Sequence, residues 1–152
     1  MKNLNIKQKL HDKCQEFLDQ RIAIVQNQIK DIQCSLESET KSSAGDKHET
    51  GRAMLQLERE KAGQQLAEIE KQQQILKKID VDAKYIKVAF GSVVETSNSN
   101  YFIAISAGEF CLENTKYIAI SVVTPIAQLM ISKQIGDCIV FRESEFEILN
   151  IH

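Results

Sequence analysis

The sequence predicts an α+β protein in which a long helical hairpin precedes a small domain with a mainly antiparallel sheet. Apolar residues recur every three or four positions over the first eighty residues, which is the period of amphipathic helices. After about residue 80 the composition changes from Gln, Lys and Glu to Val, Ile, Phe, Tyr and Ser in short runs, as in strands. We therefore expect a hairpin over 1–80, with its tip at 42–51, and a globular domain over 81–152.

The first helix is expected to run to about residue 41, because neither glycine nor proline interrupts it. Its apolar stripe consists of Leu10, Cys14, Leu18, Ile22, Val25, Ile29, Ile32 and Leu36. At 1.5 Å per residue such a helix is roughly 55 Å long. A small domain cannot bury a helix of that length, so it needs a partner along its axis.

The second helix, from Lys47 to about Ile79, is the predicted partner. Its stripe consists of Leu55, Ala62, Leu66, Ile69, Leu76 and Ile79. Gln73 takes one stripe position and weakens the seam there. Two matched stripes joined by a short, glycine-marked turn favour an antiparallel coiled-coil hairpin. An intermolecular coiled coil through either helix is the alternative.

The rest of the chain reads as short strands separated by turns. Strands are predicted at 84–90, 92–96, 101–105, 117–123, 138–141 and 146–151, with a break or bulge at Gly91. Pro125 is the only proline, and with Thr124 as its cap it marks the start of a short helix over 126–132. Gly136 and Asp137 form a turn before the last hairpin.

Composition narrows the class of function. A net charge of −2 without a basic patch argues against free-standing nucleic-acid binding. No apolar run is long enough to span a bilayer, and the first residues lack the core of a signal peptide, so we expect no membrane contact.

The cysteines point to a reducing compartment. Their positions are Cys14, Cys34, Cys111 and Cys138. Such scattered positions, with no CxxC pair, suit neither a zinc site nor a disulfide framework. We expect reduced thiols in a cytoplasmic protein, mostly buried, with Cys34 exposed because it lies off the apolar stripe.

The predicted tip carries an acidic pair, Asp46 and Glu49, three residues apart. Asp at an N-cap with Glu at N3 forms a capping box, which would start the second helix whatever the function. The same two carboxylates could instead serve metal chemistry, and the two roles can coexist. His48 is expected to be a solvated helix residue rather than a metal ligand.

Three sequence motifs follow one another along the chain. The tip reads Gly45-Asp46-Lys47-His48-Glu49-Thr50, the globular part opens with Val88-Ala89-Phe90-Gly91-Ser92-Val93-Val94, and Ile120-Ser121-Val122-Val123-Thr124-Pro125-Ile126-Ala127 later precedes Gly136-Asp137. With these motifs the chain resembles the bacterial Gre family of transcript-cleavage factors over almost its full length. The resemblance implies a coiled-coil hairpin followed by an FKBP-like domain.

The resemblance also implies a mechanism. Gre factors bind RNA polymerase at the rim of its secondary channel and are not enzymes themselves. The hairpin reaches the polymerase active site, where the acidic pair helps hold a Mg²⁺ ion and the polymerase cleaves the 3′ end of backtracked RNA. Two metals assist phosphodiester hydrolysis by activating the nucleophile and stabilising the leaving oxygen. Carried over to this chain, the catalytic and metal-binding pair is Asp46 and Glu49.

Other roles carry over by position. The docking surface for polymerase would include Ser121, Thr124, Pro125, Ile126, Ala127 and Gln128. Lys47 and Arg52 are candidates for contact with phosphate of the nascent RNA. Lys47 and His48 stand where the family has Leu-Ser, which leaves a non-cleaving regulator of the secondary channel as the first alternative. A coiled-coil adaptor that binds another protein is the second.

Overall fold

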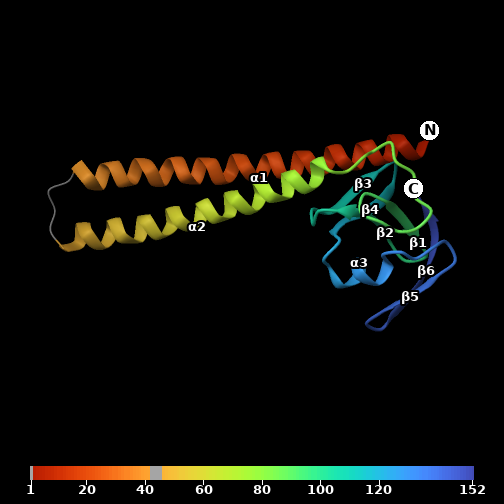
Figure 1. The fold of residues 1–152 in the computed structure, drawn as a ribbon. Coiled ribbons are helices and arrows are strands. Elements are labelled where there is room, and N and C mark those ends of the chain that lie inside the picture. The colour runs from red at the N-terminus through yellow and green to blue at the C-terminus, as the bar shows by residue number, and fades with distance from the viewer. Residues whose placement is uncertain (1, 42–45) are drawn as a thin grey trace. The chain divides into compact units, whose positions relative to one another are not determined.

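A computed structural model describes the backbone of residues 2–41 and 46–152 and the side chains of residues 6–38 and 50–152. The helices and strands follow the order α1, α2, β1, β2, β3, β4, α3, β5, β6 (Figure 1). The chain forms two compact units. One contains residues 18–73, which we call the arm, and the other contains residues 1–17 and 74–152, which we call the sheet unit.

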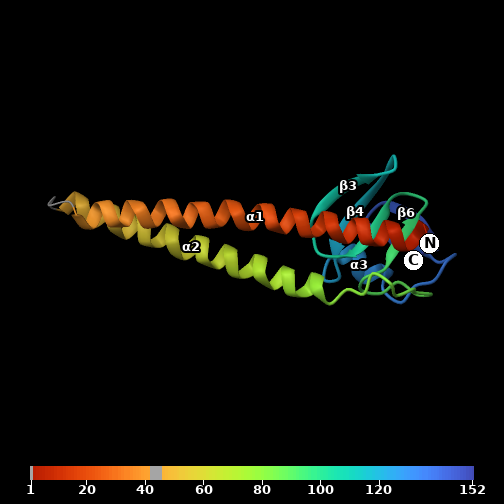
Figure 2. The ribbon, with the colours of Figure 1, turned by 90° about the horizontal axis from the view of Figure 1, so that it is seen from above.

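The arm is made from the two predicted helices, α1 (Lys2–Lys41) and α2 (Asp46–Lys77). Within it they run next to each other in both views (Figures 1 and 2). The predicted stripes face inward: Leu18, Val25, Ala62 and Ile69 are buried, and the stripe residues nearer the tip are half-buried. The helical hairpin is thus confirmed, because each helix buries its apolar face on the other.

The sheet unit contains one six-stranded sheet with the order β3-β4-β2-β1-β6-β5. The strands are β1 (Val93–Thr96), β2 (Asn100–Ala104), β3 (Gly108–Leu112), β4 (Thr115–Ser121), β5 (Cys138–Phe141) and β6 (Ser144–Ile151). Every neighbouring pair is antiparallel except β2 and β4, which are parallel. The predicted α+β class with a mainly antiparallel sheet is therefore confirmed.

One face of the sheet is covered by the short helix α3 (Pro125–Met130). Val94, Tyr101 and Ile118 stand opposite one another on neighbouring strands. They share an apolar core with Ala127 and Met130 of α3, and with Ile139, Phe146 and Ile148 of the last hairpin. Burial of the phenol raises the pKa of Tyr101. This core fixes the position of α3 on the sheet.

The first turns of α1 are bound to the sheet unit. The Lys7 side chain is almost fully buried, donates from Nζ to the Ala83 carbonyl at 2.7 Å, and lies 4.7 Å from the centre of the Tyr85 ring. Burial lowers the pKa of Lys7, and the charge of Asp80 opposes that shift. His11 Nε2 lies 3.1 Å from the Leu76 carbonyl oxygen. A buried cation with these partners holds the segment after α2 against α1.

Several predictions of secondary structure were wrong. Residues 84–90 form no strand; Lys87 makes a single bridge with Gln134, and Val88 exchanges backbone hydrogen bonds with Lys133 and Ser132. The backbone bonds of this segment therefore go to the loop after α3 and not to the sheet. Strand β3 was missed, because it is an edge strand whose side chains are largely exposed and hence carry a weak apolar pattern.

The expected burial of the cysteines was also wrong. All four are free, but only Cys14 is buried, whereas Cys34, Cys111 and Cys138 are exposed. Cys111 and Cys138 lie on the two edge strands, where one face of the strand meets solvent. The exposure predicted for Cys34 is confirmed.

Among the described helices, none is long and apolar enough to span a membrane.

Candidate functional site

The predicted tip lies where α1 ends at Lys41 and α2 begins at Asp46. Residues 42–45, including Gly45, lie outside the described residues, and so do the side chains of Asp46, Lys47, His48 and Glu49. The backbone from Asp46 to Glu49 is helical. Both acidic residues therefore belong to the first turn of α2, where positions three apart lie on one face.

The start of a helix suits negative charge. The first backbone N–H groups of a helix have no partner within it, and the aligned peptide dipoles place partial positive charge there. Asp46 and Glu49 occupy positions of this turn, where a helix favours negative charge in general. The capping box and the metal role both remain predictions.

Arg52 has a structural contact that the sequence did not indicate. Its Nη1 donates to the Leu36 carbonyl oxygen of α1 at 3.3 Å, so it joins the two helices close to the tip. The contact between Arg52 and phosphate remains a prediction.

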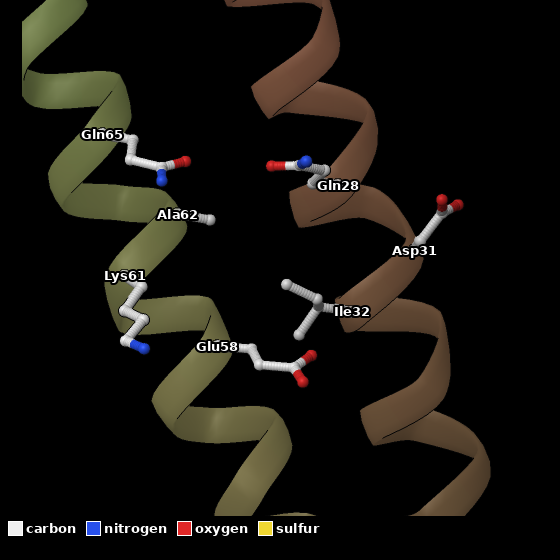
Figure 3. A pocket seen from close by; sticks show the side chains of 7 residues that line it. All are labelled: Gln28, Asp31, Ile32, Glu58, Lys61, Ala62 and Gln65. Carbon is white, nitrogen blue, oxygen red and sulfur yellow. The ribbon is translucent and has the colours of Figure 1, made fainter.

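Farther along the arm, a groove of about 380 Å³ opens between the helices (Figure 3). Gln28, Asp31 and Ile32 line it from α1, and Glu58, Lys61, Ala62 and Gln65 line it from α2. In Figure 3 the side chains of Gln28 and Gln65 point toward each other, and the short Ala62 leaves a gap opposite Ile32. At this point of the arm the two helices thus leave space between them that their side chains do not fill.

The second predicted region, Ser121 to Gln128, forms the end of β4, a turn and the start of α3. Thr124 holds the N-cap position with Pro125 behind it, as predicted, but the Thr124 hydroxyl does not cap the helix. It donates to the Ser121 carbonyl oxygen at 2.7 Å. Gln128 donates from its side-chain amide to the Val122 carbonyl oxygen. These bonds fix the turn before any partner binds.

The exposure of this turn decides which side chains a partner could reach. Ala127 is fully buried in the core, so it supports the surface from below. Pro125 and Gln128 are exposed. Val123 is 77% exposed and Leu129 is 41% exposed, and both were missed as candidates. Their apolar character next to Pro125 was the available signal, because large exposed apolar residues that cluster often mark interaction sites.

The two candidate regions belong to different units: the acidic pair to the arm, and the turn before α3 to the sheet unit. Among the side chains that the structure describes, no group of three or more His, Cys, Asp and Glu could hold a metal ion.

Neither a protein-family model nor a curated protein matches this sequence. Solved structures do match, among them the following two. The transcription factor Gfh1 is 19% identical, with 90% of this chain and 92% of that chain covered and a TM-score of 0.35. GreA factor homolog 1 (Gfh1) of Thermus thermophilus is also 19% identical, with 90% and 93% covered and a TM-score of 0.34.

The chain resembles the Gre family. The second of these structures is that of a GreA homologue. At this identity and these TM-scores, however, the similarity does not define what the chain binds or does.

Proposed function

We propose that this chain is a Gre-like transcription factor that binds RNA polymerase at the secondary channel and stimulates cleavage of backtracked RNA. The observation that carries the proposal is the position of the acidic pair: Asp46 and Glu49 share the first turn of α2, next to the connection between two long helices. The factor would be no enzyme, because the polymerase would perform the hydrolysis.

The length of helix α2 supports delivery of this pair. Helix α2 has 32 residues, which at 1.5 Å per residue correspond to about 48 Å. A helical pair of that length can bring a few side chains deep into a narrow channel. Rigidity matters there, because a catalytic group displaced by about 1 Å loses much of its effect.

The residues present suit a shared magnesium ion. Carboxylate oxygens are the ligands that Mg²⁺ prefers, and it commonly takes only one or two of them from one protein. Asp46 and Glu49 would supply such ligands, and the remaining ones would come from the polymerase. A bound Mg²⁺ would stabilise charge that develops during phosphodiester hydrolysis. The nascent RNA would be contacted only indirectly, through Lys47 and Arg52.

Docking would use the turn before α3. Val123, Pro125 and Gln128 are accessible there, and the hydroxyl of Thr124 and the amide of Gln128 fix the turn. An apolar residue on a preformed turn loses little conformational entropy when it is buried by a partner. A factor that binds RNA polymerase in this way would act in the cytoplasm.

Affinity capture with purified RNA polymerase tests the proposal. The wild-type chain should retain polymerase, and Val123→Asp should weaken binding by tenfold or more. Val140→Asp is the matched control, because Val140 is 63% exposed on β5, whose neighbouring residue Ile139 faces the core. Failure of the wild-type chain to retain polymerase would exclude the proposal and favour an adaptor that binds another protein.

A second candidate function has its own support. Lys47 and His48 lie between the acidic residues and alter the charge that would meet Mg²⁺ and RNA phosphates. A regulator that binds the channel without stimulating cleavage would tolerate these residues. Polymerase binding without faster RNA cleavage would identify this function.

A further inference from the structure

The sheet unit has a polar pocket that is unrelated to the arm and to the turn before α3. It has a volume of about 320 Å³, within the range of small-molecule sites. The pocket lies between the β1–β2 turn and the β3–β4 turn. Its lining consists of Asn98, Ser99, Asn100, Glu109, Asn114, Thr115, Lys116 and Ile118.

One wall, the β1–β2 turn, is fixed by hydrogen bonds. The Thr96 hydroxyl accepts from the backbone N–H groups of Asn98 at 3.2 Å and Ser99 at 2.9 Å, and it donates to the Ser99 carbonyl oxygen. Ser97 binds Glu147 of β6 through its N–H at 3.0 Å and accepts the Glu147 N–H through Oγ at 2.9 Å. This wall therefore keeps its shape without a ligand.

The other wall is the tight turn between β3 and β4. Glu113 and Asn114 both have positive φ angles, 50° and 66°. Asn tolerates this left-handed conformation better than most residues, and two such residues make the turn that joins antiparallel strands. The Glu113 carboxylate is 3.2 Å from the ammonium group of Lys9 on α1. This ion pair is exposed, so the shape of the second wall is set mainly by the turn itself and by the pairing of Leu112 with Thr115 across it.

The polar groups that line the pocket are open to solvent. Asn98 and Asn114 are exposed and Asn100 is half-buried, and no hydrogen bond among the described residues uses their side-chain amides. Each amide offers two donors and one acceptor. Together with the exposed part of Ile118, which otherwise packs against the core, three such groups form a surface that can bind a ligand with several hydroxyl groups and a C–H face.

Charge favours a neutral ligand. The lining has one cation, Lys116, and one carboxylate, Glu109, and these two groups do not form an ion pair within the described residues. They lie on neighbouring strands on the same face, because Glu109 pairs with Ile118 and Cys111 pairs with Lys116. A phosphate would meet as much negative as positive charge, whereas a hydroxyl can donate to Glu109 and accept from Lys116.

We propose that this pocket binds the vicinal hydroxyl groups of a neutral sugar ring, either the ribose of a nucleoside or a free saccharide. The proposal is independent of the proposed function, since it concerns neither polymerase binding nor the acidic pair. It rests on two preformed walls, three unpaired amides and the balanced charge between them.

Titrations of the full chain followed by ¹H–¹⁵N NMR test the proposal. The probes are ribose, glucose, adenosine and 2′-deoxyadenosine. We expect saturable shifts of the side-chain amide signals of Asn98, Asn100 and Asn114, with adenosine binding at least tenfold more tightly than 2′-deoxyadenosine if the source is a nucleoside. Binding of glucose without adenosine would assign the pocket to saccharides.

Substitutions separate this pocket from unspecific binding. Asn98→Ala combined with Asn114→Gly should weaken binding at least tenfold, and glycine retains the positive φ at residue 114. Asn27→Ala, at an exposed position of α1, is the matched control and should leave binding unchanged. The proposal would be overturned if none of the four probes produced saturable shifts. It would also be overturned if adenosine and 2′-deoxyadenosine bound equally well and neither ribose nor glucose bound.

Discussion

The arm and the sheet unit bury their apolar residues to different degrees. In the sheet unit Phe102, Ile103 and Ile148 are fully buried, and Ile103 and Ile148 share their core with α3. In the arm many stripe residues, such as Ile32 and Leu55, stay half-buried, because two helices can cover only one face of each other. The sheet unit therefore supplies most of the stability, and the arm supplies an extended surface.

The strongest test of this difference compares two isoleucines. Ile103→Ala should reduce the free energy of unfolding by about 3 kcal/mol, because it leaves a cavity in a closed core. Ile32→Ala should cost about 1 kcal/mol, because its side chain is already partly in water. Urea unfolding followed by circular dichroism measures both values. Equal losses would show that the arm is as well packed as the sheet unit.

The buried thiol of Cys14, in the sheet unit, makes the free energy of unfolding depend on pH. Burial raises the pKa of Cys14 from 9.0 to about 12. Between these values the unfolded chain releases the proton and the folded protein keeps it, so stability falls as pH rises above about 9. At pH 10 this loss should be about 1.4 kcal/mol relative to the same group at neutral pH.

The matched variant for this test is Cys14→Val, which has no proton to release. Its free energy of unfolding should fall less than that of the wild-type chain between pH 8 and pH 10. Thiol alkylation gives a second measurement, since Cys34, Cys111 and Cys138 are exposed and should react well before Cys14. A Cys14 that reacts as fast as Cys34 would contradict its burial.

The groove in the arm predicts a smaller effect, an increase in the free energy of unfolding when it is filled. Ala62→Leu should fill the gap opposite Ile32 and raise the free energy of unfolding by about 1 kcal/mol. Ala67→Leu is the control, because Ala67 is exposed on the same helix and its substitution should change stability by less than about 0.5 kcal/mol. A destabilising Ala62→Leu would mean that the groove cannot admit the larger side chain.

The sequence was informative wherever one local pattern decides the structure. Both helices of the arm follow from apolar stripes of constant period, and strand β5 begins and ends as predicted at residues 138 and 141. The short helix α3 follows from Thr124 and Pro125. These elements are set by residues close together in the chain.

Other features depend on distant partners and could not be predicted. Residues 84–90 have strand-like composition, but their backbone bonds to the loop after α3. Lys7 reads as a solvated helix residue, yet it is buried by Ala83 and Tyr85, more than seventy residues away. The polar pocket joins two turns that no sequence pattern relates. The acidic pair was found by its spacing, and its chemical role remains a proposal.

RNA cleavage in stalled polymerase complexes tests the central claim most directly. We predict that the wild-type chain accelerates cleavage in the presence of Mg²⁺ at least tenfold, and that Asp46→Ala with Glu49→Ala abolishes the acceleration without loss of polymerase binding. Asp31→Ala with Glu58→Ala removes the same charge from the middle of the arm and should retain activity. Cleavage by the Asp46→Ala/Glu49→Ala protein at the wild-type rate would contradict the account.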